Sequence, residues 1–475
     1  MLIVGGNQSA AGGYNVDNSV RINRPSSDSM SGVTNGTSTN QNKYTVSFWT
    51  KRGRLSNGST LNIMEGYTGS SDTGTGSIFW RTSEALVIGG YNTNWRITNR
   101  LFRDVSAWYH IVFSVDTTQA TADDRIKVYV NGVEETSFST KNNPSQNSST
   151  GLNNNSAALN LFRRVLFGVN DNHGDGYFSE FCFIDGSALD PTSFGEFDED
   201  SGIWKPISVS GLTFGTNGFY LQFEDSSALG DDTSGNSNDF TLNNITSVDQ
   251  STDTCTNNSA TMNPLDNYYT AATISEGNLK IVTQNGGGYA PRTSTFALSQ
   301  GKWYAEVKYV SRSSGDNFSL IGIKSTQTTN TNYLGQNTND YGYYSDDGDY
   351  YQAGSSNSYG ASYDQGDIIG IYLDLDNNKL YFAKNGTIQN SGTGISITDP
   401  ASTDHGHYFI SAGDYGNSVQ ITYEWNFGSP TFSISSGNTD ANGYGNFEYD
   451  PSSGTFDGAS KDFYAINSKN LAEYG

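Results

Sequence analysis

Apolar and polar side chains alternate along many short stretches of the chain, and each stretch ends at a polar or glycine-rich turn. In "WYHIVFSVD" (108–116), Tyr109, Ile111, Phe113 and Val115 fall on one face. A period of two is typical of strands with one buried face. The same alternation recurs in "YTVSFWTK", "RIKVYVNG", "GKWYAEVKYVS", "GDIIGIYLDLD" and "KLYFAKNG". The pattern predicts an all-β protein built from antiparallel strands.

Two strand–turn–strand units stand far apart in the sequence. They are "DRIKVYVNGVEE" (124–135) and "NNKLYFAKNGTI" (377–388). Asn-Gly is the dipeptide that best tolerates the positive φ angles of a two-residue hairpin turn, so Gly132 and Gly386 are expected at positive φ. Each hairpin follows a long apolar strand, which predicts two tandem β-sandwich (jelly-roll) domains.

The strand signals divide the 475 residues into five segments. Residues 14–207 are expected to form the first sandwich and residues 267–428 the second. Residues 208–266 contain long polar stretches and are predicted to be a connector with a few strands. Residues 429–475 read as a tail with little core of its own. Residues 1–13, "MLIVGGNQSAAGG", are either a first edge strand with a loose linker or an anchor that docks into a partner.

Composition supports this division and excludes some functions. Only 34% of residues are hydrophobic but 13% are aromatic, so tyrosine and phenylalanine must form much of the core. The formal charge is 26 − 49 = −23, which argues against nucleic acid and anionic membranes as partners. No stretch is apolar for long enough to suggest membrane insertion. Cys182 and Cys255 are expected to be free thiols, with a single bridge as the alternative.

Two known domain families share motifs with the chain. "WYHIVFSVD", "RIKVYVNGV" and "GYFSEFCFIDGSAL" occur in the order found in laminin-G-like, concanavalin-A-like jelly rolls, and this resemblance covers about residues 14–205. "GKWYAEV", "GDIIGIYLDLDNNKLYFAKNG" and "WNFG" resemble the motifs of a SPRY domain. SPRY domains are also bent β-sandwiches, so the resemblance implies two sandwiches in tandem.

Three further segments resemble structural proteins of tailed bacteriophages, especially marine ones: "YNVDNSVRIN", "TNNSATMNPLDN" and "GYGNFEYD…FYAINSKNL". The resemblance implies a virion surface protein, assembled in the host cytoplasm and released by lysis. Its partners would be other virion proteins and a glycan or protein of the host surface, and trimers are common among such appendages. The chain shows no tail-anchoring domain or repeat shaft, which favours a virion surface protein over a tail fibre.

Candidate catalytic groups are few. "EFDED" places Glu196, Asp198 and Asp200 at alternating positions, as glycan-cleaving enzymes do, but it follows a polar connection. "YLDLD" offers Asp374 and Asp376 at a strand end. The sequence has neither a Ser-His-Asp order nor a nucleophile elbow, so we expect no enzymatic activity.

Metal ligands are equally sparse. "NDNHGDG" gathers Asp171, Asn172 and Asp175, and calcium prefers oxygen ligands of this kind. Laminin-G-like domains often bind calcium at one rim, although a hydrogen-bonded polar turn explains the same residues. His405 and His407 offer only two imidazoles and are read as a solvated turn. We therefore expect that no cofactor is required, with calcium as the candidate ion.

The tyrosine-rich run 339–364 is the candidate recognition surface. Its proposed ligand-binding residues are Tyr344, Asp346, Asp347, Asp349, Tyr350 and Tyr351. Tyrosine rings can stack on sugar rings while carboxylates accept hydrogen bonds from hydroxyl groups. The alternative is that the tyrosines build the core, because aliphatic residues are scarce. Tyr350 and Tyr351 flank "DDGD" and are expected to be the most exposed of the set.

The sequence thus favours a non-enzymatic protein on the outside of a phage particle that contacts a host-surface glycan or protein. A capsid decoration or cement protein with a purely structural role is the alternative, and a glycan depolymerase is the third. These functions differ in what they require. Recognition needs exposed aromatic loops, decoration needs apolar patches against other subunits, and hydrolysis needs paired carboxylates in a cleft.

Overall fold

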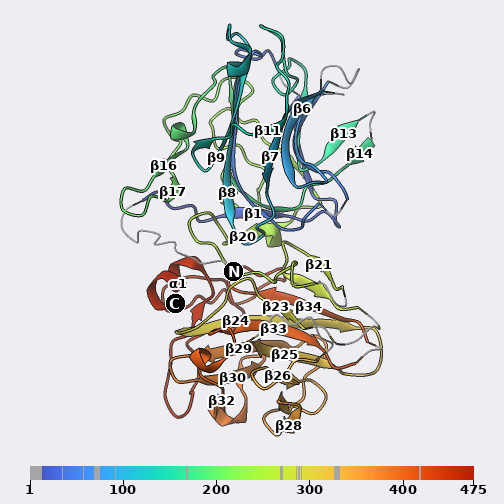
Figure 1. The fold of residues 1–475 in the computed structure, drawn as a ribbon, viewed down its shortest axis with the longest axis vertical. Helices are drawn as coiled ribbons and strands as arrows, with labels where there is room; N and C mark the ends of the chain where they lie inside the picture. The colour runs from blue at the N-terminus through green and yellow to red at the C-terminus, as the bar shows by residue number, and fades with distance from the viewer. Residues whose placement is uncertain are drawn as a thin grey trace. The chain divides into compact units, whose positions relative to one another are not determined.

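The computed structural model describes residues 13–475 apart from short gaps at 35, 57, 69–74, 91–92, 167–168, 268–270, 285, 287–288, 290, 326–331 and 417–418. The anchor proposed at residues 1–13 lies, except for Gly13, outside the described residues. The chain divides into two compact units, with Thr256 as the last residue of the first and Asn257 as the first residue that follows it. Figure 1 shows strands throughout both units.

Two sheets of eight described strands form the first unit (Figure 1). The first sheet has the order β10(Val133–Glu134), β9(Ile126–Val130), β8(Trp108–Asp116), β3(Lys43–Arg52), β15(Gly176–Asp185), β1(Ser19–Ile22), β20(Gln250–Ser251), with β18(Phe219–Leu221) also on β15. The second has the order β11(Phe138–Lys141), β7(Thr93–Leu101), β6(Ala85–Gly90), β5(Gly76–Trp80), β4(Leu61–Tyr67), β12(Ala158–Leu161), β2(Ser29–Thr34), β19(Thr241–Asn243). Two short ribbons are added, β13(Arg164–Leu166) with β14(Val169–Asp171), and β16(Gly195–Phe197) with β17(Trp204–Pro206).

The core of the first unit lies between these two sheets. Phe48 and Phe113 enter it from the first sheet, and Ile78, Trp80 and Leu161 enter it from the second. All five side chains are at most 1% exposed. They occupy the apolar positions of the alternating pattern, which is why the period of two predicts a sandwich here.

The segment predicted to be a connector belongs mostly to the first sandwich. Its strand β18 pairs with β15, β19 pairs with β2, and β20 pairs with β1. Each of these strands has only two or three residues, which is too short for an alternating pattern to appear in the sequence. Residues 208–256 therefore complete the first unit, and the second begins at Asn257 rather than at 267.

The second unit also consists of two facing sheets (Figure 1). Nine described strands form one, in the order β21(Thr273–Ser275), β22(Lys280–Val282), β34(Ile421–Asn426), β24(Lys302–Arg312), β29(Ile368–Asp374), β30(Lys379–Lys384), β31(Thr387–Ile388), with β32(Ile395–Ser396) on β30 and β35(Tyr464–Ala465) on β24. Six form the other, in the order β23(Arg292–Thr293), β33(Phe409–Asp414), β25(Ser319–Lys324), β26(Tyr341–Tyr344), β27(Tyr350–Gln352), β28(Ser355–Asn357).

The C-terminal segment, predicted to be a tail with little core, covers the outer face of the nine-stranded sheet. Phe447, Phe456 and Phe463 pack there on Tyr304 and Tyr372, and all five side chains are at most 1% exposed. The segment ends in helix α1(Ser468–Tyr474), whose first turn is capped by the side chain of Asn467. Among the described residues, no helix is both long and apolar enough to cross a membrane.

A buried carboxylate holds this segment against the sheet. Glu306 on β24 is fully buried and accepts hydrogen bonds from the backbone N–H groups of Glu448 and Tyr449 at 3.1 and 2.8 Å. The hydroxyl of Tyr304 and the side-chain amide of Asn426 donate to it at 2.9 and 3.0 Å. Burial raises the pKa of Glu306 to about 6, and the four donors oppose that rise.

Both Asn-Gly dipeptides form the predicted two-residue turns. Asn131 and Gly132 have φ angles of 49° and 78°, and Asn385 and Gly386 have 47° and 76°. Two successive positive φ angles define a type I′ turn. A Cβ atom at Gly132 would lie 2.3 Å from the ring of Trp204, and one at Gly386 would lie 2.5 Å from the ring of Tyr449.

Replacing either turn glycine with valine should therefore destabilise its own unit. We expect Gly132→Val and Gly386→Val each to lower the free energy of unfolding by about 1 kcal/mol or more, because a β-branched residue is strained at positive φ. Thermal unfolding of the full chain measures the effect. Unchanged melting temperatures in both variants would contradict the close packing of these turns.

Candidate functional site

The tyrosine-rich run divides between the two faces of the six-stranded sheet. Tyr341, Tyr343, Tyr359 and Tyr363 are buried in the core of the second unit, as the core alternative predicted. Tyr344 and Tyr351 belong instead to a separate cluster on the outer face. Tyr350 and Tyr351 are the most exposed tyrosines of the run, as expected, but each is only partly exposed and Tyr350 packs against the inner core. Successive residues of a strand point to opposite faces, which separates these neighbours.

Five tyrosines meet on the outer face, and we call them the outer tyrosine cluster: Tyr289, Tyr333, Tyr344, Tyr351 and Tyr415. Tyr415 is central, with ring-centroid distances of 4.6 Å to Tyr333, 5.3 Å to Tyr344 and 5.5 Å to Tyr351. Tyr344 is only 5% exposed, whereas the other four are partly exposed. The cluster thus has a buried base and an accessible layer of rings.

Close backbone packing positions the cluster. Leu320 and Tyr344 are cross-strand partners on β25 and β26, and both side chains are buried. The loop that carries Tyr333 and Leu334 lies directly over Gly342, where a Cβ atom would be 2.6 Å from the carbonyl oxygen of Leu334. Leu334 is fully buried beneath this loop. A glycine at 342 is therefore what lets the loop bring Tyr333 beside the strand tyrosines.

Two exposed carboxylates adjoin the cluster. Asp346 and Asp347 lie in the turn between β26 and β27, and their charges help raise the pKa of Tyr344. Asp346 makes no hydrogen bond or ion pair within the described part of the chain, while Asp347 accepts one from the N–H of Asp349 at 2.9 Å. Asp349 itself accepts a short hydrogen bond from Ser356 and so supports the turn. Asp346 and Asp347 are the carboxylates most open to a ligand.

The phenols of Tyr351 and Tyr333 are neutral at physiological pH. Burial raises the pKa of Tyr351, and the neighbouring charge of Asp347 raises it further. Burial also raises the pKa of Tyr333, with a smaller contribution from Tyr415. A neutral phenol can donate a hydrogen bond as well as accept one. The face therefore offers aromatic rings, hydroxyl groups that donate and carboxylates that accept.

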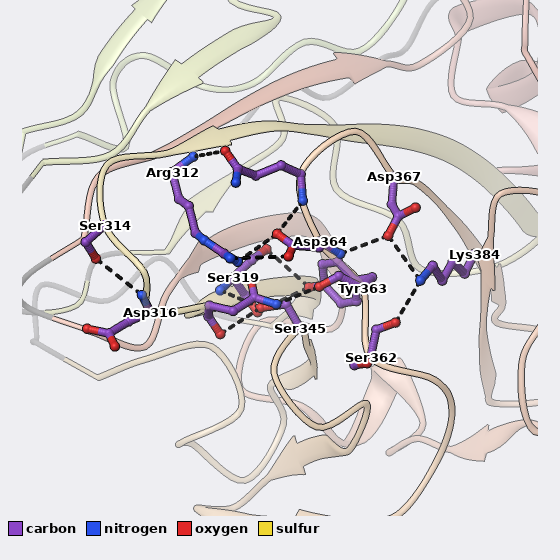
Figure 2. Close-up of polar contacts among 12 residues, drawn as sticks. Arg312, Ser314, Asp316, Ser319, Ser345, Ser362, Tyr363, Asp364, Asp367 and Lys384 are labelled. Carbon is purple, nitrogen blue, oxygen red and sulfur yellow. Dashed lines mark hydrogen bonds and ion pairs between the residues drawn. The ribbon is translucent and has the colours of Figure 1, made fainter.

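A network of polar contacts fixes the strands beneath the cluster (Figure 2). The hydroxyl of Tyr363 donates to the carbonyl of Tyr343 at 2.9 Å. The hydroxyl of Ser345 accepts from the N–H of Ser319 at 2.9 Å (Figure 2). Asp364 binds both terminal nitrogens of Arg312, at 2.7 and 3.2 Å. These contacts hold the loop 358–367 on the sheet, so Tyr344 and Tyr351 stand on a rigid support.

The neighbouring part of that loop is held from its other side. Asp367 accepts from the N–H of Asp364 at 2.8 Å and forms an ion pair with Lys384 at 3.1 Å (Figure 2). The ammonium of Lys384 also donates to the carbonyl of Ser362 at 2.9 Å. Burial of the Asp367 carboxyl is outweighed by these donors, so its pKa is lowered.

The residues proposed for calcium have other partners in this structure. Asp171 accepts two hydrogen bonds from Arg164, at 2.7 and 2.6 Å. Asp175 is 3% exposed and accepts from the backbone N–H groups of Arg24 and Arg54. The main-chain carbonyl of Asn172 accepts from the N–H of Asn62. Among the described residues, no three His, Cys, Asp or Glu side chains group as a metal site would require.

The carboxylates considered for hydrolysis also have other partners. Asp198 closes a turn onto Ser201 and pairs with Lys205 at 3.1 Å, which lowers its pKa to about 2. Glu196 pairs with the same lysine at 3.4 Å. Asp374 is fully buried against Lys461 at 2.8 Å. These carboxylates therefore lie in ion pairs with lysines and do not face one another across a cleft.

Of the four histidines, His110 packs in the interior of the first unit and His405 lies beside a turn. His110 is 1% exposed and lies between the rings of Trp49 and Trp204, at centroid distances of 4.7 and 5.9 Å. Its Nδ1 accepts from the indole N–H of Trp204 at 2.9 Å, so Nε2 carries the proton and donates to the Ser47 hydroxyl. Burial lowers the pKa of His110 to about 3. His405 flanks a turn at Gly406, where φ is 73°.

Raised pKa values mark two more carboxyl groups in the first unit. Burial raises the pKa of Glu65 to about 8, and its Oε2 accepts from the N–H of Val165 at 2.6 Å. Burial also raises the pKa of Glu180 to about 7, and the hydroxyls of Tyr14 and Tyr220 both donate to it. Both thiols, Cys182 and Cys255, are free and buried.

Sequence patterns pointed to Tyr344, Tyr351, Asp346 and Asp347 but missed much of the outer tyrosine cluster. Tyr289, Tyr333 and Tyr415 come from three other segments, and Phe318 packs beside Tyr415 at 6.4 Å. All four lie at or near loops outside the tyrosine-rich run. Strand pairing brings these segments together, and no local motif records that contact.

Two family models match separate parts of the chain. The model of the concanavalin A-like lectin/glucanases superfamily matches residues 26–180. The SPRY domain model matches residues 302–424, which include the strands that carry the outer tyrosine cluster. The two matches fall in the two sandwiches, in the order that the motifs predicted.

Curated relatives match the SPRY region alone. Ran-binding protein 9 of Danio rerio is 34% identical over 135 residues, and its counterpart in Homo sapiens is 35% identical over 135 residues. Each alignment covers 26% of this chain, and it spans 21% and 18% of the respective relatives. The chain therefore matches about a fifth of the length of these proteins.

Solved structures with local similarity include the SPRY domain of human HERC1 and stonustoxin. The HERC1 domain is 16% identical, with a TM-score of 0.29, and the match covers 34% of this chain and 96% of that one. Stonustoxin is 17% identical, with a TM-score of 0.26, and the match covers 35% and 27% respectively. On the two family matches, the chain is a concanavalin A-like, laminin-G-type domain followed by a SPRY domain.

Proposed function

We propose that this chain is a non-enzymatic recognition protein whose SPRY domain binds a surface glycan through the outer tyrosine cluster. The observation that supports it is the pairing of partly exposed rings with open carboxylates. Tyr333, Tyr351 and Tyr415 offer the rings, and Asp346 and Asp347 offer the carboxylates. SPRY and concanavalin A-like domains suggest protein or glycan binding, and this proposal selects glycan for the tyrosine face.

The chemistry of the face suits a polyol. The apolar side of a sugar ring can pack on an aromatic ring, while its hydroxyl groups donate to carboxylates. Neutral phenols supply the matching donors, since burial keeps the pKa of Tyr351 and Tyr333 above the ordinary value. A net charge of −23 disfavours strongly anionic polymers as ligands.

The proposal requires neither catalysis nor a cofactor. Two of the carboxylates that the sequence suggested for hydrolysis, Asp198 and Asp374, are held in ion pairs with Lys205 and Lys461. Glycoside hydrolysis instead requires two carboxyl groups that flank the scissile bond. The ion pairs of Asp198 and Asp374 with lysines therefore support a binding function over glycan cleavage.

The proposed setting is the outside of a tailed-phage particle. Its support is the resemblance of "YNVDNSVRIN", "TNNSATMNPLDN" and "GYGNFEYD" to segments of phage structural proteins. In that setting the chain would assemble with other virion proteins, as trimers of the kind common among appendages, and present its tyrosine face to the host. Labelling purified particles with antibodies against the chain would test this location.

Removing single rings from the cluster tests the binding proposal. We expect Tyr351→Ala and Tyr415→Ala each to weaken binding to an array of bacterial surface glycans at least tenfold, about 1.4 kcal/mol, as truncated aromatic anchors do. Asp346→Asn should weaken binding by a smaller factor. The matched control is Tyr350→Phe, which alters the adjacent tyrosine on the inner face and should leave binding unchanged.

Two results would contradict the proposal. One is retained glycan binding by correctly folded Tyr351→Ala, which would exclude this face. The other is the absence of any bound glycan on the array for the parent chain. Phage particles that carry Tyr351→Ala, adsorb normally and break easily would favour the decoration alternative.

A further inference from the structure

A cavity lies in the SPRY-containing unit, apart from the tyrosine face. Its volume is about 350 Å³. It is lined by Gly301, Lys302, Asp376, Ser460, Lys461, Asp462, Tyr464 and Tyr474. These residues come from the start of β24, the turn after β29, the strand β35 with the residues before it, and the end of α1. We propose that this cavity binds a small neutral saccharide.

The lining combines an aromatic wall with polar groups. Tyr464 and Tyr474 stack on each other with a centroid distance of 4.0 Å and an interplanar angle of 14°. Each ring covers one face of the other, so the stacked pair is held in place and an outer ring face remains available for contact. Helix α1 holds Tyr474 in place, and the pairing of Tyr464 with Trp303 holds the other ring. A sugar ring can pack on a surface of this kind.

Several polar groups of the cavity retain hydrogen-bonding capacity. Lys302 donates to Asp376 at 2.7 Å, which uses one of three ammonium hydrogens. Ser460 and Asp462 are exposed, and within the described residues neither side chain makes a hydrogen bond or an ion pair. Lys461 is already bound to Asp374 and to the hydroxyl of Tyr381, at 2.8 and 2.9 Å. Free donors and acceptors therefore surround the same space.

The charge of the lining disfavours an anionic ligand. Two lysines and two aspartates of the lining cancel, and the buried carboxylate of Asp374 behind Lys461 adds one negative charge. An anionic ligand would therefore be repelled, whereas an uncharged one needs no counter-charge. Hydroxyl groups can accept from Lys302 and donate to Asp462, which is the hydrogen-bonding pattern of an uncharged sugar.

The size of the cavity limits the ligand to a small one. Pockets for small molecules range from about 300 to about 1,000 Å³, and this cavity lies near the lower limit. One or two sugar rings fit that space, whereas a long polymer would need an open groove. The site thus differs from the proposed glycan-binding face, which is an outer surface of the opposite sheet.

Ligand-detected NMR on the full chain tests the inference. Methyl glucoside, methyl galactoside, maltose and cellobiose serve as neutral probes, with glucuronate as the charged comparison. We expect saturation transfer to at least one neutral probe and at least fivefold weaker binding of glucuronate. Failure of all four neutral probes, or equal binding of glucuronate, would overturn the inference.

Variants of two exposed side chains then locate the binding. Ser460→Trp should fill the cavity and weaken binding of the probe at least tenfold, and Asp462→Asn should weaken it severalfold without altering the fold. Asp404→Asn changes an exposed aspartate outside the lining and should have no effect. Tyr415→Ala should weaken binding at the tyrosine face but leave this signal intact. Probe binding that survives both Ser460→Trp and Asp462→Asn would overturn the assignment to this cavity.

Discussion

Replacing Asp253 with alanine is expected to lower the free energy of unfolding of the first unit by about 3–5 kcal/mol, because it removes the counter-charge of a buried ammonium. Lys51 and Asp253 form an ion pair at 2.7 Å, and their side chains are 0% and 2% exposed. The second oxygen of Asp253 accepts from the indole N–H of Trp108 at 3.0 Å. Burial lowers the pKa of Lys51, which the charge of Asp253 opposes.

Urea denaturation followed by tryptophan fluorescence measures the loss, since five of the seven tryptophans precede Thr256. The matched control removes a surface partner: Asp123→Ala breaks a pair with Lys141 whose side chains are 59% and 42% exposed, and should change stability little. Replacing both buried partners, as Lys51→Met with Asp253→Leu, should recover much of the loss. If Asp253→Ala were as stable as the parent protein, water would have to reach the ammonium of Lys51 in the folded state.

The stability of the first unit should fall on acidification because of His110. The folded protein keeps this ring neutral down to a pKa of about 3, whereas the unfolded chain protonates it near the ordinary value of 6.5. Between these values the unfolded state binds more protons. The stability that neutral His110 contributes is therefore complete above pH 6.5 and is lost progressively as pH falls toward 3.

The difference between parent and variant isolates this effect from other titrating groups. Between pH 7 and pH 4 the parent should lose about 3 kcal/mol more than His110→Gln, at about 1.4 kcal/mol for each pH unit in the window. Glu65 and Glu180 have raised pKa values and act in the opposite direction, but they are common to both proteins. His405→Gln changes an exposed histidine of the second unit and serves as the control, since it should leave the stability of the first unit unchanged. If the free energy of unfolding of the parent and of His110→Gln changed equally with pH, His110 would be protonated to the same extent in the folded and unfolded states.

Much of the fold could be predicted from the sequence because its long strands carry a local signal. The strands from Trp108 and Ile368 alternate over seven or more residues, and the Asn-Gly turns fix their hairpins. The short strands β18, β19, β20 and β35 have two or three residues and leave no such record. Their segments look polar, yet Thr254 is fully buried and Asp253 is 1% exposed. Pairing with distant strands, rather than composition, decides their burial.

The candidate site was predictable only in part for a related reason. A run rich in tyrosine predicts aromatic contacts, but it does not show which tyrosines lie in the core and which lie at the surface. Strand direction placed Tyr350 inward and Tyr351 outward, although they are adjacent. Tyr289 and Tyr415 joined the cluster through β-sheet pairing across more than a hundred residues of sequence. Such contacts depend on register, which a single sequence does not contain.

The aromatic layer that residues 429–466 form over the nine-stranded sheet determines how small a working fragment of the second unit can be. A fragment cut at the limits of the SPRY match, residues 302–424, would uncover the rings of Tyr304, Tyr372 and Tyr381 together. It would also remove the two backbone N–H groups that donate to Glu306, so this carboxylate would lie on an apolar surface exposed to water. The fragment to express, and the unit that could be exchanged between proteins, is therefore residues 257–475, a β-sandwich that includes its own C-terminal cover.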